Sequence, residues 1–143
     1  MPSATSPISK PLPQATPTAA PFWAGLRAGE VRIQRCEACR AWVFYPRTNC
    51  PRCLSTRLAW QTVAGTGRLH AFTIARLPTA PFFVDETPQL LAIIELDEGV
   101  RMASTLVGVE EGEVAIGMRL APVFEPTTGG ESVLLRFTRA EEG

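Results

Sequence analysis

The stretch that decides the fold runs from Arg35 to Cys53 and reads RCEACRAWVFYPRTNCPRC. It contains all four cysteines of the chain, arranged as two C-x-x-C pairs, Cys36 with Cys39 and Cys50 with Cys53. Two residues between cysteines allow a tight turn to direct both thiolates at one point, so two such pairs can complete a tetrahedron around a metal ion. The spacing therefore predicts a zinc ribbon.

The predicted metal site is structural, because four thiolates leave no position for a metal-bound water. A segment this short buries too little apolar surface to fold alone, and structural zinc supplies about 10–16 kcal/mol in finger peptides. Iron can occupy four thiolates equally well, so the site is better defined than the metal. Two disulfides would need an exporting context, and a redox-active C-x-x-C is normally a single pair on a βαβ unit.

The 143-residue chain has no formal net charge, but its charges are unevenly distributed. Up to Arg76 ten lysines and arginines face two acids, and beyond it four arginines face twelve acids, so the two parts carry +8 and −8. A basic ribbon can meet phosphates or an acidic partner, or its arginines simply solvate a small module. No apolar run reaches membrane-span length and residues 1–20 lack the core of a secretion signal, so we expect a cytoplasmic protein.

The chain divides by composition into a tail, a ribbon and a body. The tail is rich in Pro, Ser, Thr and Ala and is expected to be disordered. A helix then begins at Pro21 and stops at Gly29, and its aromatic residues Phe22 and Trp23 pack on the ribbon or dock on another chain. Short strands at 31–34 and 42–45 suit a ribbon. The predicted divisions are 1–20 for the tail, 21–59 for helix plus ribbon, and 60–140 for the body.

The body reads as short strands separated by turn residues, which is typical of a small β-barrel. Gly65 and Gly67 interrupt the first strand and indicate a bulge or sharp coil. Asp97-Glu98-Gly99 joins the second and third strands in a hairpin. The expected strands are 63–76, 89–96, 101–107, 118–124 and 132–138. Five strands with a long, bent first member describe an OB-fold, although strand counting does not distinguish it from an SH3-like or split barrel.

No set of residues in the sequence would catalyse a reaction alone. The cysteines are assigned to the metal, and the single histidine, His70, lies inside the first barrel strand, where a lone histidine is more often a surface or core residue. Asp97 and Glu98 are ordinary turn formers. There is no G-x-S-x-G elbow, P-loop or dinucleotide fingerprint. We therefore expect a partner or carrier rather than a free-standing enzyme.

The loop at 77–88, LPTAPFFVDETP, has three prolines and two adjacent phenylalanines, Phe82 and Phe83. Because loops lie on the surface, these phenylalanines are candidates for docking a partner; otherwise they cap the open end of the barrel. Single-stranded nucleic acid is an alternative ligand, since OB-folds often bind it. That function requires aromatic and basic residues on the second and third strands, which here offer only Arg101.

Several short motifs resemble a known family, the acyl-CoA-associated OB-fold proteins with an N-terminal rubredoxin-like zinc ribbon, domain of unknown function thirty-five. The matching motifs are FWAGL at 22–26, QRC at 34–36, FYPR at 44–47, GTG at 65–67 and LDEG at 96–99. The resemblance covers residues 22 to about 139. Some members have lost their cysteines, whereas this chain keeps all four.

The resemblance implies a non-catalytic accessory subunit. Members accompany thiolase-like enzymes, steroid side-chain aldolases or hotdog-fold enoyl-CoA hydratases, and they bridge the partner and its acyl-CoA. By that resemblance the chain is expected to be part of a hetero-oligomer. Separately, the acidic body argues against a nucleic-acid partner, and the lack of a long apolar run argues against a membrane. Arg47 in the FYPR motif, with Arg35 and Arg40 nearby, is the candidate set for the coenzyme's phosphates, because arginine suits phosphate recognition.

Overall fold

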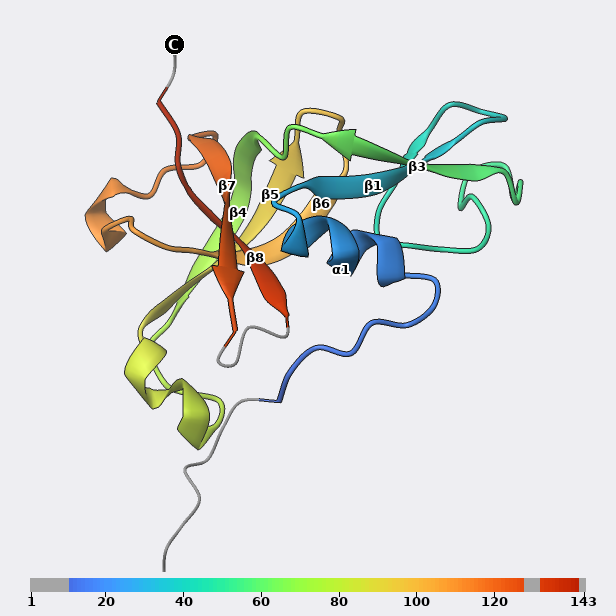
Figure 1. Cartoon of the computed structure of the whole chain (residues 1–143). Helices are drawn as coiled ribbons and strands as arrows, with labels where there is room; N and C mark the ends of the chain where they lie inside the picture. Colours follow the sequence, from blue (N-terminus) through green and yellow to red (C-terminus); the bar gives the residue numbers. More distant parts are fainter. Residues whose placement is uncertain (1–10, 128–131, 142–143) are drawn as a thin grey trace, which may run out of the picture.

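The protein is described here by a computed structural model that covers residues 11–127 and 132–141. Its first part is a helix, α1 (Ala20–Arg27), followed by the strands β1 (Val31–Cys36), β2 (Trp42–Val43) and β3 (Leu58–Val63). The three strands form an antiparallel sheet in the order β2-β1-β3. All six residues of β1 pair with β3, from Val31↔Val63 to Cys36↔Leu58. The two cysteine turns therefore lie at one end of this sheet (Figure 1).

The strand β3 continues the ribbon sheet beyond residue 60, where the predicted body begins. All six of its residues pair with β1, so this strand crosses the predicted division between residues 59 and 60. The pairing with β1 explains the difference, because a two-residue β2 alone leaves most of β1 without a partner. The chain then turns at Gly65, whose φ of 79° lies in the left-handed region that glycine adopts easily.

The second part is a closed five-stranded barrel, which confirms the predicted OB-fold. Its strands are β4 (Gly67–Ala75), β5 (Gln89–Leu96), β6 (Arg101–Leu106), β7 (Arg119–Pro126) and β8 (Val133–Arg139), in the order β4-β5-β6-β8-β7. The turn after Leu96 joins β5 and β6 as the predicted hairpin. A register shift between Leu69 and Ala71 bends β4. Two short 3-10 helices, η1 (Pro81–Glu86) and η2 (Glu111–Glu113), lie in the connections.

Alternating side chains of the strands fill the barrel. Along β5, Leu90, Ala92, Ile94 and Leu96 are buried, whereas Leu91 between them is exposed. The other strands add residues of the same kind to this core: Leu69, Met102, Leu106, Leu120 and Phe137. Period-two burial of this type selects the strand register, because a slip of one residue would turn the apolar set outward.

The ribbon and the barrel share packing. Phe44 and Val63 of the ribbon lie against the barrel core. At the junction, a Cβ built on Gly65 would lie 2.7 Å from Val31 Cγ2 and 3.1 Å from Pro122 Cγ, so β1 and β7 approach the turn closely. The helix α1 lies along β1 and also contacts β8 (Figure 1). The two parts thus bury apolar surface against each other.

The helix α1 begins and ends as its sequence indicates. Pro21 occupies its first turn, and Gly29, with a φ of 77°, follows its last residues. Leu26 is buried, and the ring centroid of Phe22 lies 5.6 Å from that of Phe44. Among the described residues there is no helix with the length and apolar content needed to cross a membrane.

Candidate functional site

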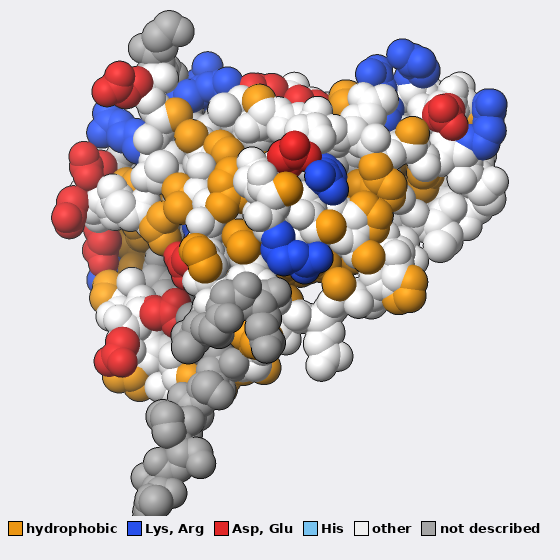
Figure 2. All heavy atoms as spheres, in the orientation of Figure 1, with side chains coloured by type: hydrophobic (Ala, Val, Ile, Leu, Met, Phe, Trp, Pro, Cys, Tyr) orange, Lys and Arg blue, Asp and Glu red, His pale blue; other side chains and the backbone are white. Residues whose placement is uncertain are grey.

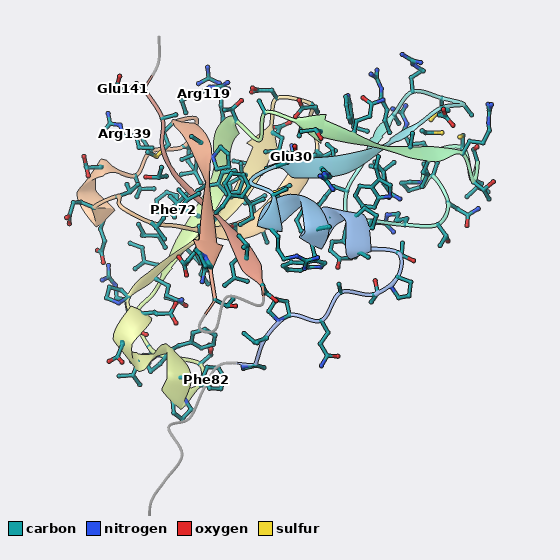
Figure 3. All side chains as sticks on the ribbon, in the orientation of Figure 1. Glu30, Phe72, Phe82, Arg119, Arg139 and Glu141 are labelled. Atoms are coloured by element: carbon teal, nitrogen blue, oxygen red, sulfur yellow. The ribbon has the colours of Figure 1, made fainter. Side chains whose placement is uncertain are left out.

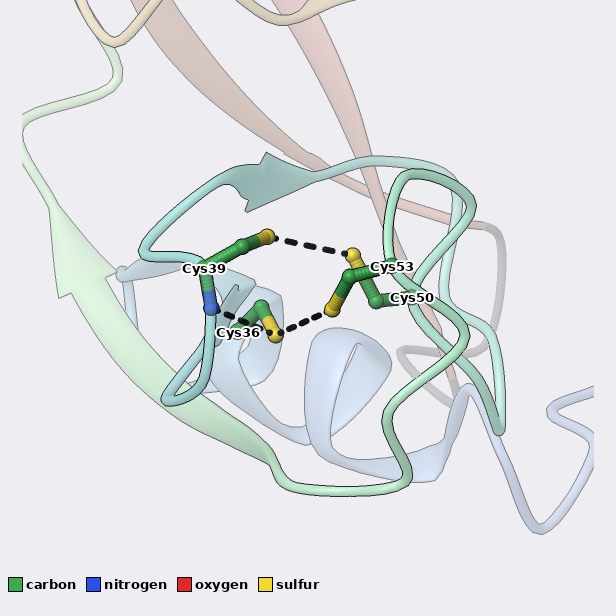
Figure 4. Close-up of side chains that lie close together, drawn as sticks. All are labelled: Cys36, Cys39, Cys50 and Cys53. Carbon is green, nitrogen blue, oxygen red and sulfur yellow. Dashed lines mark hydrogen bonds between the residues drawn. The ribbon is translucent and has the colours of Figure 1, made fainter.

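The four cysteines meet at one end of the ribbon sheet. Cys36 ends β1 and Cys39 follows it in a turn, while Cys50 and Cys53 lie in the turn that precedes β3. Their four sulfur atoms all lie within 4.8 Å of one another. The Cys36 and Cys53 sulfurs are 3.5 Å apart and those of Cys39 and Cys50 are 3.6 Å apart (Figure 4). The cluster is therefore built from both halves of the predicted motif.

These distances fit a tetrahedral metal ion. A Zn–S bond of about 2.3 Å gives an edge of about 3.8 Å between two sulfurs of a tetrahedron, close to both short separations. A disulfide would need about 2.05 Å, and all four cysteines are free thiols. Four thiolates complete the tetrahedron, so a metal held here would keep no position for a reacting water.

Backbone N–H groups of the two turns stabilise the thiolates. The Cys39 N–H donates to the Cys36 sulfur at 3.4 Å and is the main cause that lowers the pKa of Cys36 to about 6. The pKa of Cys50 is also lowered, chiefly by the Cys53 N–H. The Ser55 N–H acts in the same direction on Cys53, but its thiol neighbours and burial outweigh that effect and raise its pKa to about 11. A bound cation would compensate this crowding of negative charge.

The loop between the two cysteine turns is fixed by Gln34, the only buried polar residue among those described. Its side-chain amide donates to the Arg47 carbonyl at 2.9 Å, and its carbonyl accepts from the Arg47 N–H at 2.8 Å. In the sequence Gln34 is notable only as part of the QRC motif, so this role was not predicted. A glutamine on an apolar strand face was the available signal, because a buried amide requires partners.

The three arginines proposed for phosphate binding lie in the ribbon in two different situations. Arg35 is engaged locally, since its Nε donates to the Arg40 carbonyl and its guanidinium lies 4.7 Å from the Trp42 ring centroid. The side chains of Arg40 and Arg47 are exposed, and within the described residues no hydrogen bond or ion pair engages either guanidinium. Figure 2 shows basic side chains at the ribbon end and mostly acidic ones at the opposite end.

The aromatic docking candidates of α1 differ from each other in burial. Phe22 is only 5% exposed, because it packs between Trp23 and Phe44, so it belongs to the interior of this structure. This placement agrees with the alternative that the helix packs on the ribbon. Trp23 is half-buried, and its indole N–H has no hydrogen-bond partner among the described residues.

Phe82 and Phe83 lie in η1, at the end of the barrel where β4 leads towards β5 (Figure 3). Both are half-buried and their rings meet edge to face with centroids 4.9 Å apart. Among the large apolar side chains of this segment, the most exposed are Leu77, at 81%, and Val84, at 55%. Val84 directly follows the two phenylalanines in the sequence, whereas Leu77 has no apolar neighbour in the chain and so carries no distinctive pattern.

The titratable residues of the barrel form structural contacts. Asp97 accepts hydrogen bonds from Arg119, at 2.6 and 2.8 Å, and from Thr66 at 2.6 Å. The Arg119 hydrogen bond is the main cause that lowers the pKa of Asp97 to about 2. His70 is exposed on β4. Within the described part of the chain, neither residue has the arrangement of a nucleophile and base.

Comparison with known proteins agrees with this architecture. The family model for the ChsH2 rubredoxin-like zinc ribbon domain matches residues 23–59, and the model for the ChsH2 C-terminal OB-fold domain matches residues 60–125. A solved structure described as the Ltp2-ChsH2(DUF35) aldolase has 30% identity and a TM-score of 0.79, and the match covers 90% of this chain and 98% of that one. The chain belongs to the DUF35 family.

Curated relatives of this DUF35 protein carry two kinds of description. A "probable enoyl-CoA hydratase alpha subunit" of Thermomonospora curvata is 36% identical over 113 residues, which are 69% of this chain and 34% of the relative. A "DUF35 domain-containing scaffold protein" of Methanothermobacter thermautotrophicus is 36% identical over 84 residues, covering 57% and 62%. The DUF35 chain thus spans about a third of the first relative and somewhat under two thirds of the second.

Proposed function

We propose that this chain is a non-catalytic accessory subunit that binds a thiolase-like, aldolase or enoyl-CoA hydratase partner and helps to hold the partner's acyl-CoA. The observation that carries the proposal is its similarity to the Ltp2-ChsH2(DUF35) aldolase structure, of whose chain 98% is covered. The descriptions of relatives as a hydratase subunit and as a scaffold protein support the same role. The working form would be a hetero-oligomer.

The chemistry of the described residues supports a role without catalysis. Four thiolates would close the metal site, and Asp97 is held in an ion pair with Arg119. We propose zinc as the metal of Cys36, Cys39, Cys50 and Cys53, with the task of holding the ribbon in shape. Bond-making groups would then belong to the partner.

The ribbon arginines are proposed to meet the phosphates of the coenzyme. Arg40 and Arg47 are exposed, whereas Arg35 would act mainly by stacking on Trp42 and holding the turn at Arg40. Replacing all three by glutamine should weaken acyl-CoA binding by the complex by about tenfold or more at low salt, because charge-assisted hydrogen bonds are lost. Arg101→Gln, an exposed change on β6, is the matched control. Unchanged affinity of the triple variant would exclude these arginines.

The apolar side chains of η1 and its flanks are proposed to contact the partner. Leu77 and Val84 are exposed on this segment, and the edge-to-face pair of Phe82 and Phe83 lies beside them. Val84→Asp should weaken assembly with the partner while leaving the fold intact, because a charge would be buried at the contact. Ile116→Asp, an exposed change in the connection before β7, is the control.

Recovery of the complex tests the proposed function directly. The tagged chain is purified from its native cell and the intact assembly is weighed by mass spectrometry. We expect a thiolase, aldolase or hydratase subunit at fixed stoichiometry, and lower acyl-CoA turnover by that subunit when this chain is omitted. Turnover of acyl-CoA by the purified chain alone would refute the proposal.

A further inference from the structure

The strand β3 forms one edge of the ribbon sheet, and no described strand pairs with its outer side. Figure 1 shows it at the margin of the ribbon, on the far side of β1 from α1. The Glu37 N–H, directly after β1, donates to the Arg57 carbonyl at 2.8 Å. Bonding direction alternates along an antiparallel pair, so the N–H and C=O of Trp60 and Thr62 point to the open edge. Among the described residues, these backbone groups have no hydrogen-bond partner.

The edge of β3 lacks the features that normally prevent pairing with another chain. Its sequence, LAWQTV, has no charged residue and no proline, and its pairing with β1 has no bulge. None of its six residues is buried, and Gln61 and Thr62 are exposed. Edge strands are usually protected by lysine, proline, a bulge or a covering segment. This edge, about 20 Å long, is therefore a template for an added strand.

The charge distribution along the chain indicates which strand fits this edge. Residues 21–63 contain seven arginines and two glutamates, a formal charge of +5, whereas residues 64–143 contain six arginines and twelve acids, a formal charge of −6. The strand β3 runs from the basic cysteine turns to the acidic barrel (Figure 2). A second copy of β3 in antiparallel orientation would set each basic ribbon end beside the acidic barrel of the other copy. A parallel orientation would set the two basic ends together.

We propose that β3 pairs antiparallel with β3 of a second copy, around a two-fold axis at Trp60, so that the two ribbons form one continuous sheet. Trp60 then faces its counterpart, and the two residues exchange two N–H···O=C hydrogen bonds. On either side, Leu58 faces Thr62 of the second copy and Ala59 faces Gln61. Every facing pair is uncharged, so no residue repels its own copy, and an aromatic pair lies at the centre. This self-association goes beyond the proposed function and needs no enzyme partner.

Sedimentation equilibrium of the full, zinc-loaded chain measures the self-association. The edge of one short strand makes a small interface, so we expect a reversible monomer–dimer equilibrium between about 0.01 and 1 mM chain. Raising the salt concentration from about 0.1 to 1 M shortens the Debye length from about 10 to 3 Å and should raise the dimer dissociation constant at least about threefold. A chain that stays monomeric up to about 1 mM overturns the proposal. A dimer insensitive to salt overturns the antiparallel orientation, which rests on the charges.

Amide hydrogen exchange followed by NMR identifies the edge that pairs. The Gln61 N–H points to β1 and should be protected at every concentration. The N–H groups of Trp60 and Thr62 should become protected only as the dimer forms, by about tenfold when nine tenths of the chains are dimeric, because exchange then proceeds from the remaining tenth. A dimer without this protection overturns the proposal. Protection that appears only when an enzyme subunit is added also overturns it, because the subunit would then occupy the edge.

Two changes at Thr62 separate edge pairing from other effects. Thr62→Pro removes an N–H that points away from β1, a position at which an edge strand tolerates proline. It removes two hydrogen bonds of the dimer and should weaken dimerisation by about tenfold or more. Thr62→Val is the matched control, because both changes remove the hydroxyl that contacts Glu30 but valine keeps the N–H. Equal dimerisation of the two variants overturns the proposal.

A second pair of variants covers the case in which Thr62→Pro does not fold. Trp60→Lys places two like charges opposite each other at the two-fold axis and should weaken dimerisation by about tenfold or more. Gln61→Lys adds the same charge at the next, exposed position, where it faces Ala59 of the second copy, and should have a smaller effect. Equal effects of the two lysines overturn the proposed register, because the charge would then act without regard to position.

Discussion

Gly67 lies where the barrel closes, and replacing it by alanine tests how tightly the strands meet there. The residue pairs with Leu96 of β5 on one side and with Leu120 of β7 on the other. An added Cβ would meet the Glu95 carbonyl oxygen and lie 2.9 Å from both Glu95 C and Leu96 Cα. All three atoms belong to the backbone, so no side-chain rotation can relieve the contact.

The expected cost follows from that geometry. Extra methyl groups in packed interiors cost about 1–3 kcal/mol when side chains can adjust. Here β5 itself must move, and the register between β4 and β7 consists of Gly67↔Leu120 and Arg68↔Arg119 alone. Alanine recovers about 0.5–1 kcal/mol of backbone entropy relative to glycine. We therefore expect Gly67→Ala to lower the free energy of unfolding by about 3 kcal/mol.

Denaturant unfolding followed by circular dichroism measures this change. Gly112→Ala is the control, because a Cβ built on Gly112 meets nothing within 4 Å, and it should change the free energy of unfolding by less than about 0.5 kcal/mol. A Gly67→Ala protein as stable as the Gly112→Ala protein would refute the reasoning, since the strands would then tolerate the extra carbon.

Three further predictions concern the ribbon and the barrel charges. Cys36→Ser should reduce the amount of bound metal, which elemental analysis measures. A chelator should unfold the wild-type ribbon, seen as a loss of chemical-shift dispersion in NMR spectra, and a ribbon that stays folded without metal would contradict a structural role. Asp97→Asn should cost about 1 kcal/mol at pH 7. The pKa of Asp97 is lowered in the folded protein, so its ionised form stabilises the fold above about pH 4, and solvent exposure of the ion pair with Arg119 keeps this contribution small. The difference between the two proteins in urea unfolding should vanish as the pH falls towards 2, and a constant difference would refute the assignment. Gln34→Leu should cost about 1–3 kcal/mol in the same assay, because it leaves the partly buried N–H and C=O of Arg47 without their partner. The exposed change Gln61→Leu should be neutral, and equal effects of the two changes would argue that Gln34 does not fix this loop.

The ribbon and the barrel were predictable from local patterns for different reasons. The Cys36–Cys39 and Cys50–Cys53 spacings restrict geometry so strongly that four residue positions specify a cluster. The barrel followed from alternation, and the strand predicted at 89–96 agrees with β5 at both ends. Such signals are local along the chain, so they can be recognised without knowledge of the tertiary contacts.

Features that depend on distant partners were not predictable in the same way. Residues 58–63 remain in the ribbon because β1 lies beside them, and the paired residues, from Cys36↔Leu58 to Val31↔Val63, are 22 to 32 positions apart in the sequence. Phe22 is buried because Phe44 is near it in space. Arg136 donates a hydrogen bond to Thr105 and lies in ion-pair range of Glu86 and Glu125, and these three residues come from three other segments. A strand arginine with an outward position otherwise looks like an ordinary surface residue.

The close approach of Val31 and Pro122 to the Gly65 turn has a consequence for association. Phe44 and Val63 also pack against the barrel core, so the turn at Gly65 that links ribbon and barrel is in contact with both and is not expected to act as a hinge. Any molecule that touches the arginine-rich end and η1 together meets two surfaces whose spacing is already set. Such a bidentate contact would lose little orientational entropy on forming, and it would discriminate against partners of the wrong span.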